Sequence, residues 1–264
     1  MANEPTGEKE SNRQASPLIG AGRSDLILSA LNHLLRIQPA GGETSGPPTI
    51  ARQKKNLGEW ARGLGLLLDA DSIIPRLGRG GQEHDIVAEG DHVIKVTRNG
   101  VFGFSPGIDL ALVASDEDAR CFHLWEATPI EYLERLELHN QLIPDLNALV
   151  GILVQADGDL AIVTSQPRFD IVPVSEKEID EWFAGKGFKK ITESAYYRVE
   201  DNLGVFDAHT KNVIRAGDQL VPFDVIPCHP AEGFLQFVED TLKAGHNLKT
   251  ERKVTTTSRS ESMK

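Results

Sequence analysis

Short apolar runs separated by turns that contain glycine and aspartate are the clearest pattern in the chain. Residues 205–226 hold such runs at 205–206, 213–214 and 220–223, and each is typical of a buried β-strand. The tripeptide Ala216-Gly217-Asp218 predicts a turn between the last two runs. The region is therefore predicted to form a strand, a loop, a second strand, a turn and a third strand.

Apolar residues at helical spacing predict helices along the rest of the chain. These helices are expected to begin at Ser24, Gln53, Thr128, Ser175 and Ala231. Thr128 and Ser175 are each followed three residues later by a glutamate, as in a capping box. The second helix is expected to end near Leu68 and the last near Lys243. We interpret the first helix as packing on the main domain rather than binding a partner.

Residues 73–97 predict three strands around a glycine-rich turn at 77–81 and a tight turn at 89–91. Glycine lets backbone N–H groups approach phosphate oxygens, because no side chain blocks them. Lys95 lies in the third of these strands and is either a solvent-facing residue or a phosphate-binding one. Further strands are predicted in residues 150–165, and a hairpin in residues 189–206.

Composition narrows the class of protein. With 264 residues, 40% of them hydrophobic and 25% charged, the chain can bury the core of one large domain or two lobes. Its net charge of −11 argues against general binding to a nucleic acid backbone. Cys121 and Cys228 lack the spacing of a zinc site or disulfide framework. Because no signal peptide or membrane-spanning run is evident, we expect a cytoplasmic protein without a membrane partner.

The same composition divides the chain into parts. Residues 1–23 and 245–264 are polar, and the second stretch is also basic and rich in serine and threonine, so both are expected to be disordered. Residues 24–50 are expected to hold an accessory helix and a linker rich in glycine and proline. Residues 51–244 are expected to form the main domain.

Three oxygen-bearing side chains mark the candidate chemistry: Asp207, Asn212 and Asp224 leave the ends of the predicted strands within a short stretch of chain. Mg²⁺ prefers hard oxygen ligands and is often held by one or two protein groups together with water and phosphate oxygens. A carboxylate five residues before an amide can accept a proton while the amide and a later carboxylate hold the metal. The residues therefore predict a metal and phosphate site, unless they only cap loops and turns.

At these residues the chain resembles the protein-kinase-like superfamily. Asp207 and Asn212 reproduce the D-x-x-x-x-N catalytic loop, and Asp224 falls where the metal-binding aspartate of D-F-G is expected. The motif D-A-H-T-K-N-V-I is closer to the D-x-H-x-x-N motif of aminoglycoside and choline phosphotransferases than to the catalytic-loop motif of eukaryotic protein kinases. From Gly80 to Ile226 the chain is similar to the compact serine/threonine/tyrosine kinase domain of bacterial polyvalent proteins of phages and mobile elements.

The resemblance implies an α+β domain over residues 51–244, with a compact two-lobed kinase-like fold and a reduced C-lobe, that uses ATP and Mg²⁺. Lys95 would pair with the α- and β-phosphates, and Glu131 or Glu134 would hold Lys95 in place. Asp207 would accept the proton of the attacking hydroxyl. The remaining implied roles are nucleotide contacts by Gly78, Gly80, Gly81 and Gln166, a phosphate contact or a loop brace by His209, and Mg²⁺ binding by Asn212 and Asp224.

The chain also departs from larger kinases. Glu83 stands where a third glycine is expected, Val205 replaces the catalytic-loop histidine, and few residues follow Asp224. Three classes of function stay open: a small protein kinase, a small-molecule phosphotransferase, and a nucleotide-binding module without catalysis. The partner is accordingly expected to be a protein or a small molecule that offers a hydroxyl as the phosphoryl acceptor.

Overall fold

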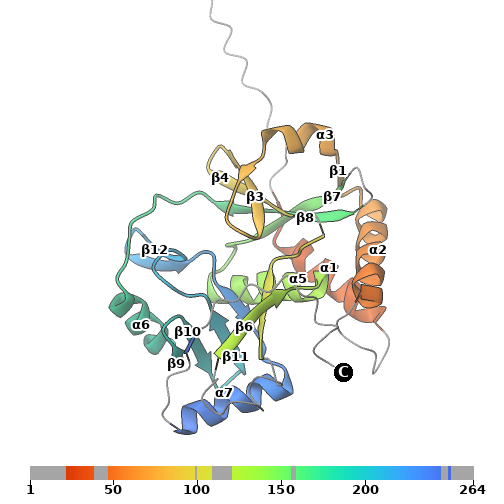
Figure 1. Cartoon of the computed structure of the whole chain (residues 1–264). Coiled ribbons are helices and arrows are strands. Elements are labelled where there is room, and N and C mark those ends of the chain that lie inside the picture. Colours follow the sequence, from red (N-terminus) through yellow and green to blue (C-terminus); the bar gives the residue numbers. More distant parts are fainter. Residues whose placement is uncertain are drawn as a thin grey trace, which may run out of the picture.

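The computed structural model describes residues 22–38, 47–98, 100–108, 121–155, 159–244 and 249–250. Helices and several small sheets occur along it, which confirms the predicted α+β class (Figure 1). The polar termini, for which the sequence predicts disorder, and the predicted linker lie mostly outside the described residues, and the predicted domain boundaries stay predictions. None of the helices in the described ranges is long and apolar enough to cross a membrane.

A six-stranded sheet forms the upper part of the molecule in Figure 1. All neighbouring strands in it are antiparallel except β1 and β7. In spatial order the strands are β1 (Leu67–Leu68), β7 (Ala148–Val154), β8 (Leu160–Pro167), β4 (His92–Thr97), β3 (His84–Glu89) and β2 (Gly78–Arg79). Lys95 therefore lies in the middle of the sheet, between β3 and β8.

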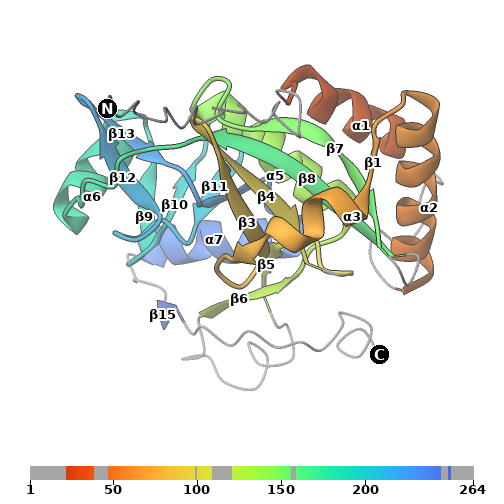
Figure 2. The ribbon, with the colours of Figure 1, turned by 90° about the horizontal axis from the view of Figure 1, so that it is seen from above.

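Helices cover both faces of this sheet. One face packs against α3 (Ala70–Ile73), which the helical turn η1 (Ile74–Arg76) follows, through a cluster that includes Val96 and Val163. The other face packs against three helices through a cluster that includes Ile152 and Ile162. These helices are α1 (Asp25–Arg36), α2 (Pro47–Gly63) and α5 (Pro129–Leu142). Figure 2 shows α1 and α2 gathered at one end of the sheet, with α5 running beneath it.

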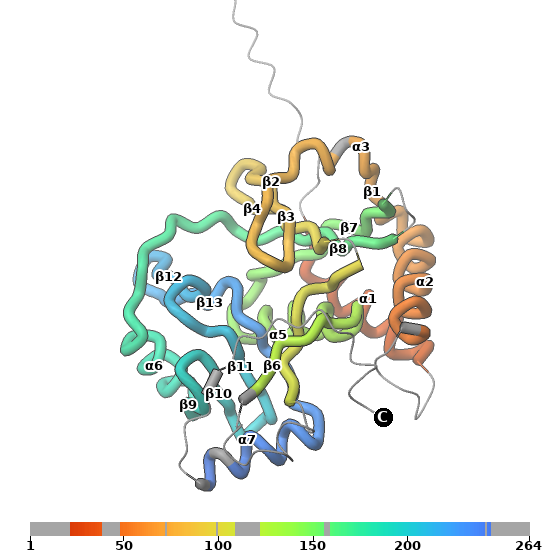
Figure 3. The backbone as a smooth tube through the Cα atoms, in the orientation of Figure 1, coloured from red at the N-terminus to blue at the C-terminus, as the bar shows by residue number. Residues whose placement is uncertain are grey.

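The lower half of the molecule holds the later part of the chain. Residues 168–174 run from β8 to α6 (Glu176–Gly185), as the tube in Figure 3 shows. A four-stranded antiparallel sheet follows, in the order β14 (Ile226–Cys228), β11 (Leu203–Phe206), β10 (Ala195–Arg198) and β9 (Lys189–Thr192). Beside it lie the hairpin of β12 (Val213–Ala216) and β13 (Gln219–Pro222) and the helix α7 (Glu232–Ala244).

A third small sheet consists of β15 (Lys249–Thr250), β6 (Cys121–Glu126) and β5 (Phe104–Gly107). Phe104 and Phe122 from this sheet share a buried cluster with Phe206 of β11 and Phe234 of α7. The sheet therefore attaches the β5–β6 segment to the lower half, although its chain leaves the upper sheet directly after β4.

Helix α5 is common to the two halves. Its residues Leu133 and Leu136 belong to the cluster beneath the six-stranded sheet, whereas Leu138 and Leu142 belong to the cluster around α6 and β11. The first part of this helix is thus buried in one core and its last part in the other. A side chain on α5 that points between the cores can reach the turn before β3 on one side and the strands of the lower half on the other.

Local signals in the sequence were reliable where a few neighbouring side chains decide the structure. Thr128 and Ser175 form the predicted capping boxes with Glu131 and Glu178. The strands predicted on both sides of the catalytic loop are β11, β12 and β13, and Gly217 takes a φ of 59° in the predicted turn.

Other predictions were wrong at their boundaries. The helix predicted from Gln53 to Leu68 begins at Pro47, because proline suits the first helical turn, and it ends at Gly63 before Gly65 takes a φ of 70°. The strand predicted from residue 73 is instead the end of α3 and the turn η1. The hairpin predicted at 189–206 has three strands, β9, β10 and β11.

Ser24 does not cap α1 with its side chain. Its backbone is already helical, with φ −66° and ψ −35°, so the hydroxyl group is not placed to accept from the first N–H groups. The hydroxyl instead donates to a carboxylate oxygen of Asp145 at 3.0 Å, which fixes the start of α1 to the loop after α5.

Candidate active site

The predicted catalytic loop, residues 207–212, leaves β11 and returns as β12. Asp207 adopts a φ of 56°, a left-handed conformation that is uncommon for residues other than glycine and that often marks functional sites. The amide nitrogen of Asn212 donates to the Asp207 carboxylate at 2.8 Å and to the Asp207 carbonyl at 2.9 Å. These two hydrogen bonds hold the carboxylate in one orientation and leave the amide oxygen of Asn212 without a hydrogen bond among the described residues.

Asp224 is fixed to the same loop through the backbone. The carbonyl oxygen of Asn212 accepts from the N–H groups of Phe223 at 3.0 Å and Asp224 at 3.4 Å. The side chains of Asn212 and Asp224 consequently line one cavity, as a shared metal site requires.

Lys95 reaches this group from the six-stranded sheet. Its Nζ donates to Oδ1 of Asp224 at 3.0 Å, although 129 residues separate the two along the chain. The Lys95 side chain is only 12% exposed, so its charge is largely removed from water. The structure thus brings the cation of β4 together with Asp224, whose backbone N–H is bound to the carbonyl of Asn212.

The charges around Asp224 keep it ionised. Burial opposes ionisation, but the positive charges of Lys95 and then Arg135 outweigh it and hold the pKa of Asp224 well below its ordinary value. The side chain remains 40% exposed because it faces the cavity. Asp224 is therefore an anion near neutral pH and can approach a bound cation.

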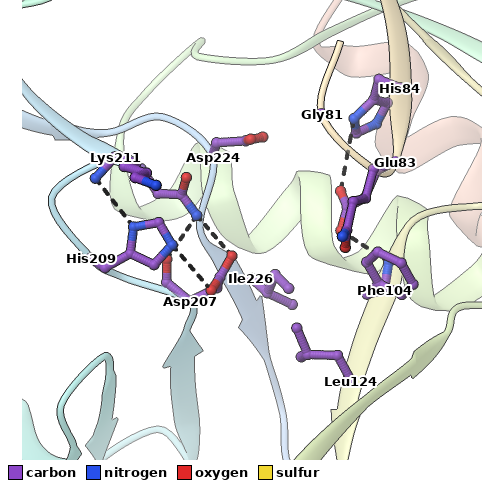
Figure 4. Close-up of a pocket in the computed structure, with 12 residues that line it drawn as sticks. Gly81, Glu83, His84, Phe104, Leu124, Asp207, His209, Lys211, Asp224 and Ile226 are labelled. Atoms are coloured by element: carbon purple, nitrogen blue, oxygen red, sulfur yellow. Dashed lines mark hydrogen bonds and ion pairs between the residues drawn. The ribbon is translucent and has the colours of Figure 1, made fainter. Parts of the chain in front are cut away.

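The cavity in front of the catalytic loop has a volume of about 490 Å³. Figure 4 shows Asp207 and His209 on one side of it and Glu83, at the end of the glycine turn, on the other. An apolar wall closes it below, formed by Phe104, Leu124 and Ile226. His209 lies with Nε2 at 3.4 Å from Oδ1 of Asp207, so it contacts the loop carboxylate directly.

A second cavity of about 310 Å³ adjoins the first at Gly81, His84 and Asp224. Its lining is mainly apolar and comes from both halves of the molecule. The apolar and aromatic lining residues are Ile86, Val93, Pro167, Phe169, Ile171, Ile214 and Phe223. Gln166 also lines this cavity, and its side-chain amide donates to the carbonyl of Phe223 at 3.1 Å.

The predicted glycines differ in their placement. Gly80 and Gly81 line the second cavity, and a Cβ atom at Gly80 would lie 2.7 Å from the His84 carbonyl oxygen, so no other residue fits there without a shift. Gly78 lies in β2 opposite Ile86 and lines neither of these cavities.

The structure does not place the two predicted helix glutamates around Lys95. Glu131 accepts the N–H of Thr128 at 2.8 Å as part of the capping box. Glu134 lines a separate cavity of about 190 Å³ beside Cys228 and His229. Helix α5 turns a different face toward Lys95, consisting of Tyr132, Arg135, Leu136 and His139.

Two charged residues of the site were missed by sequence reasoning. Glu83 and Arg135 form an ion pair at 2.8 Å, and their side chains are only 13% and 7% exposed. The available signal for Glu83 was its place at the end of the glycine turn, and the signal for Arg135 was its position between Leu133 and Leu136, where a buried stripe is expected.

The donor set fits a magnesium ion that is completed by phosphate and water. Asn212 and Asp224 offer an amide oxygen and a carboxylate within one cavity, and Mg²⁺ commonly binds to few protein groups in this way. Within the described ranges, no cluster of three or more His, Cys, Asp or Glu residues forms a metal site by itself.

The comparison with known families agrees with this site. The family model of the serine/threonine/tyrosine kinase found in polyvalent proteins matches residues 119–227 and confirms the resemblance drawn from the sequence. The matched part includes Asp207, Asn212 and Asp224, whereas Lys95 and the glycine turn precede it. No curated protein and no solved structure matches the chain.

Proposed function

We propose, taking the kinase-like segment at residues 119–227 as the premise, that this chain is an ATP-dependent phosphotransferase with a compact two-lobed fold and a reduced C-lobe. One observation carries the proposal: Lys95 of the upper sheet lies 3.0 Å from Asp224, and Asp224 lines one cavity together with Asp207 and Asn212. An amine beside two carboxylates and an amide is the set of groups that phosphoryl transfer from a nucleotide needs.

The second cavity supports binding of the adenine base. It is lined largely by apolar side chains, and the strand β8 ends at its edge with Gln166 and Pro167. A planar base between apolar side chains with backbone polar groups at one edge is a common arrangement for a small ligand. The phosphates would then extend past Gly80 and Gly81 toward Asp224.

The chain's own residues position the phosphates. Lys95 would bind the α- and β-phosphates, and the glycine turn would offer backbone N–H groups. Asn212 and Asp224 would hold Mg²⁺, which neutralises developing charge on the phosphates when it is bound. Asp224 and Lys95 contact each other directly now, so nucleotide binding would exchange this ion pair for contacts to metal and phosphate.

Asp207 would accept the proton of the acceptor hydroxyl. In the transfer step the hydroxyl oxygen forms a bond to the γ-phosphorus, and the bond from that phosphorus to the oxygen bridging to the β-phosphate breaks, so that ADP leaves. The hydroxyl proton moves to the Asp207 carboxylate, which Asn212 orients at 2.8 Å. His209, at 3.4 Å from the same carboxylate, would brace the loop or contact a phosphate.

The acceptor that we propose is a serine, threonine or tyrosine hydroxyl of a protein, as in the description of the matched family. The alternative acceptor is the hydroxyl of a small molecule, with which the D-x-H-x-x-N motif is also compatible. The two are separated by an acceptor panel of Ser/Thr-rich protein, aminoglycosides and amino alcohols.

The test is transfer of labelled phosphate from ATP in the presence of Mg²⁺. Asp207→Asn should lower kcat by roughly 10²- to 10⁴-fold, because it removes the proton acceptor but keeps the side-chain shape. Asp224→Asn should reduce turnover and the response to Mg²⁺, whereas Asp218→Asn, in the exposed turn after β12, should match the wild type. Equal turnover in all four proteins would refute the assignment, and a nucleotide-induced rise in Tm without turnover would indicate a binding module.

A further inference from the structure

A buried ion pair between the glycine turn and helix α5 stands next to the proposed phosphate site. Arg135 is only 6% exposed, and its Nη1 donates to both carboxylate oxygens of Glu83, at 2.9 and 2.8 Å. The Glu83 carboxylate also accepts the N–H of Phe104 at 3.2 Å. The end of the glycine turn is thus attached both to α5 and to the start of β5.

Arg135 extends this attachment to the other wall of the cleft. Its Nε donates to the carbonyl oxygen of Val225 at 3.3 Å, and Val225 directly follows Asp224. One guanidinium group therefore contacts the end of the glycine turn and the segment that carries the proposed metal-binding carboxylate.

The surrounding chain is shaped to fit this pair. Gly103 adopts a φ of 75°, and a Cβ atom there would lie 3.3 Å from Nη1 of Arg135 and from an oxygen of Glu83. A side chain at residue 103 would be strained in this conformation and would press on both charged groups. The close packing restricts the pair to one geometry.

Stability alone does not account for the pair. Two buried charges lose their hydration, and a hydrophobic pair of similar size is often as stable or more stable. Burial raises the pKa of Glu83, because it disfavours the charged carboxylate. The positive charge of Arg135 opposes this rise, so the attraction within the pair offsets a cost of desolvation. A buried pair that touches two walls of a cleft is instead suited to fixing the distance between them.

Nucleotide binding would affect the Arg135–Glu83 ion pair differently from the Lys95–Asp224 contact. In the proposed complex Lys95 binds phosphates and Asp224 binds a metal, so their direct contact competes with nucleotide binding. Arg135 contacts Glu83 and the backbone of Val225, and neither contact uses the Asp224 carboxylate. These contacts can therefore persist while metal and phosphates enter.

We propose that Arg135, paired with Glu83, is a positioning residue that holds the glycine turn and the Asp224 segment at the spacing that the nucleotide phosphates and metal require. The resemblance to kinases led us to expect that a glutamate on the helix would position the site. In this chain the helix would instead supply a cation, Arg135, and the glycine turn would supply the carboxylate, Glu83. The inference rests on the proposed function, because its effect is read through ATP and Mg²⁺.

The test compares the full-length wild type with Arg135→Met, Arg135→Lys and Glu83→Gln. Arg198→Met is the control, because Arg198 forms a more exposed ion pair with Asp201, at 2.6 Å, and lines none of the site cavities. For each protein we would measure Tm, the Kd of ATP, kcat, and the Mg²⁺ concentration that gives half-maximal rate.

Arg135→Met and Glu83→Gln should each lower kcat by about 10- to 100-fold and raise the Mg²⁺ requirement, since small displacements of reacting groups have effects of this size. The Kd of ATP should change less than kcat. Arg135→Lys keeps the charge and should recover part of the rate. A double variant that combines Arg135→Met with Glu83→Gln should be no slower than the slower of the two single variants, because the residues act as a unit. The control should keep wild-type values.

The outcomes separate the two proposals. A wild type that neither binds ATP nor turns it over refutes the proposed function and this inference with it. A wild type that is active, with folded Arg135 and Glu83 variants whose kcat and Mg²⁺ response are unchanged, refutes the positioning role alone. If Arg135→Met does not fold, Arg135→Lys and Glu83→Gln decide by the same criteria.

Discussion

Two histidines buried at the core of the site should make the protein sensitive to mild acid. His139 is 2% exposed, and its Nε2 donates to the carbonyl of Pro222, just before Asp224. Burial, together with the charges of Arg135 and Lys95, lowers its pKa to about 4. Burial and Lys95 likewise lower the pKa of His84 to about 3. Both side chains are therefore neutral in the folded protein at pH 5.

The sign of the effect follows from proton binding. In the unfolded chain a histidine has its ordinary pKa of about 6.5, so between that pH and the folded pKa the unfolded chain binds more protons. Lowering the pH through this range therefore stabilises the unfolded state. With folded pKa values of about 4 and about 3, each histidine should reduce the free energy of unfolding by about 2 kcal/mol between about pH 7 and pH 5.

A loss of about 4 kcal/mol for the pair would be large against the typical 5–15 kcal/mol of a folded domain. The assay is urea unfolding followed by tryptophan fluorescence at about pH 7, 6 and 5. His139→Gln keeps a donor for the Pro222 carbonyl and removes the titrating group, so it should lose about 2 kcal/mol less than the wild type over this range.

The matched substitution at a more exposed histidine is His92→Gln, because the His92 side chain is 45% exposed. A His139→Gln variant that loses stability in parallel with the wild type would refute the claim that His139 is neutral because it is buried.

Three further substitutions test the packing around the site. Gly80→Ala should lower the free energy of unfolding by about 1–3 kcal/mol and weaken ATP binding, because the new Cβ would lie 2.7 Å from a backbone oxygen. Phe183→Ala should cost about 3–5 kcal/mol, since this ring is fully buried and stacks at 4.1 Å on Tyr196. Thr128→Ala should cost about 1 kcal/mol through loss of the cap of α5. Urea unfolding measures all three, and calorimetric titration measures the ATP effect.

Matched variants make these results decisive. Gly81→Ala has no heavy atom within 4 Å of the new Cβ, so it should be close to the wild type in stability. Equal effects at Gly80 and Gly81 would contradict the steric argument. A Phe183→Ala variant as stable as the wild type would contradict the assigned core. Ser175→Ala removes the cap of the second capping box, so it should cost about as much stability as Thr128→Ala.

The parts of the site that the sequence predicts correctly are local in the chain. Asp207 and Asn212 lie on one loop between two short strands, and a hydrogen bond five residues apart needs no distant partner. The capping boxes of α5 and α6 are equally local. The meeting of Lys95 with Asp224 depends on the packing of the whole chain, and only the resemblance to a kinase placed the two together before the structure did.

The choice of helix glutamate was wrong for a reason that helix geometry explains. Glu131 and Glu134 are three residues apart and lie on one half-exposed stripe of α5, whereas Tyr132, Arg135 and His139 form a buried stripe. Both stripes are visible in the sequence as polar residues three to four positions apart. Apolar residues occur all around this helix, however, so the pattern alone did not show which polar stripe faces the site.

Helix α5 decides the geometry of the site because it is the element that both cores share. A rigid helix fixed at one end to the sheet of Lys95 and at the other to the strands of the catalytic loop sets the distance between them. Its buried polar stripe reaches across that distance: Tyr132 contacts His84 at 2.8 Å, Arg135 contacts Glu83 and Val225, and His139 contacts Pro222. Every one of these partners lies within three residues of the glycine turn's end or of Asp224. A substitution on this stripe should therefore alter phosphate and metal geometry together, even though none of its side chains belongs to the proposed metal ligands.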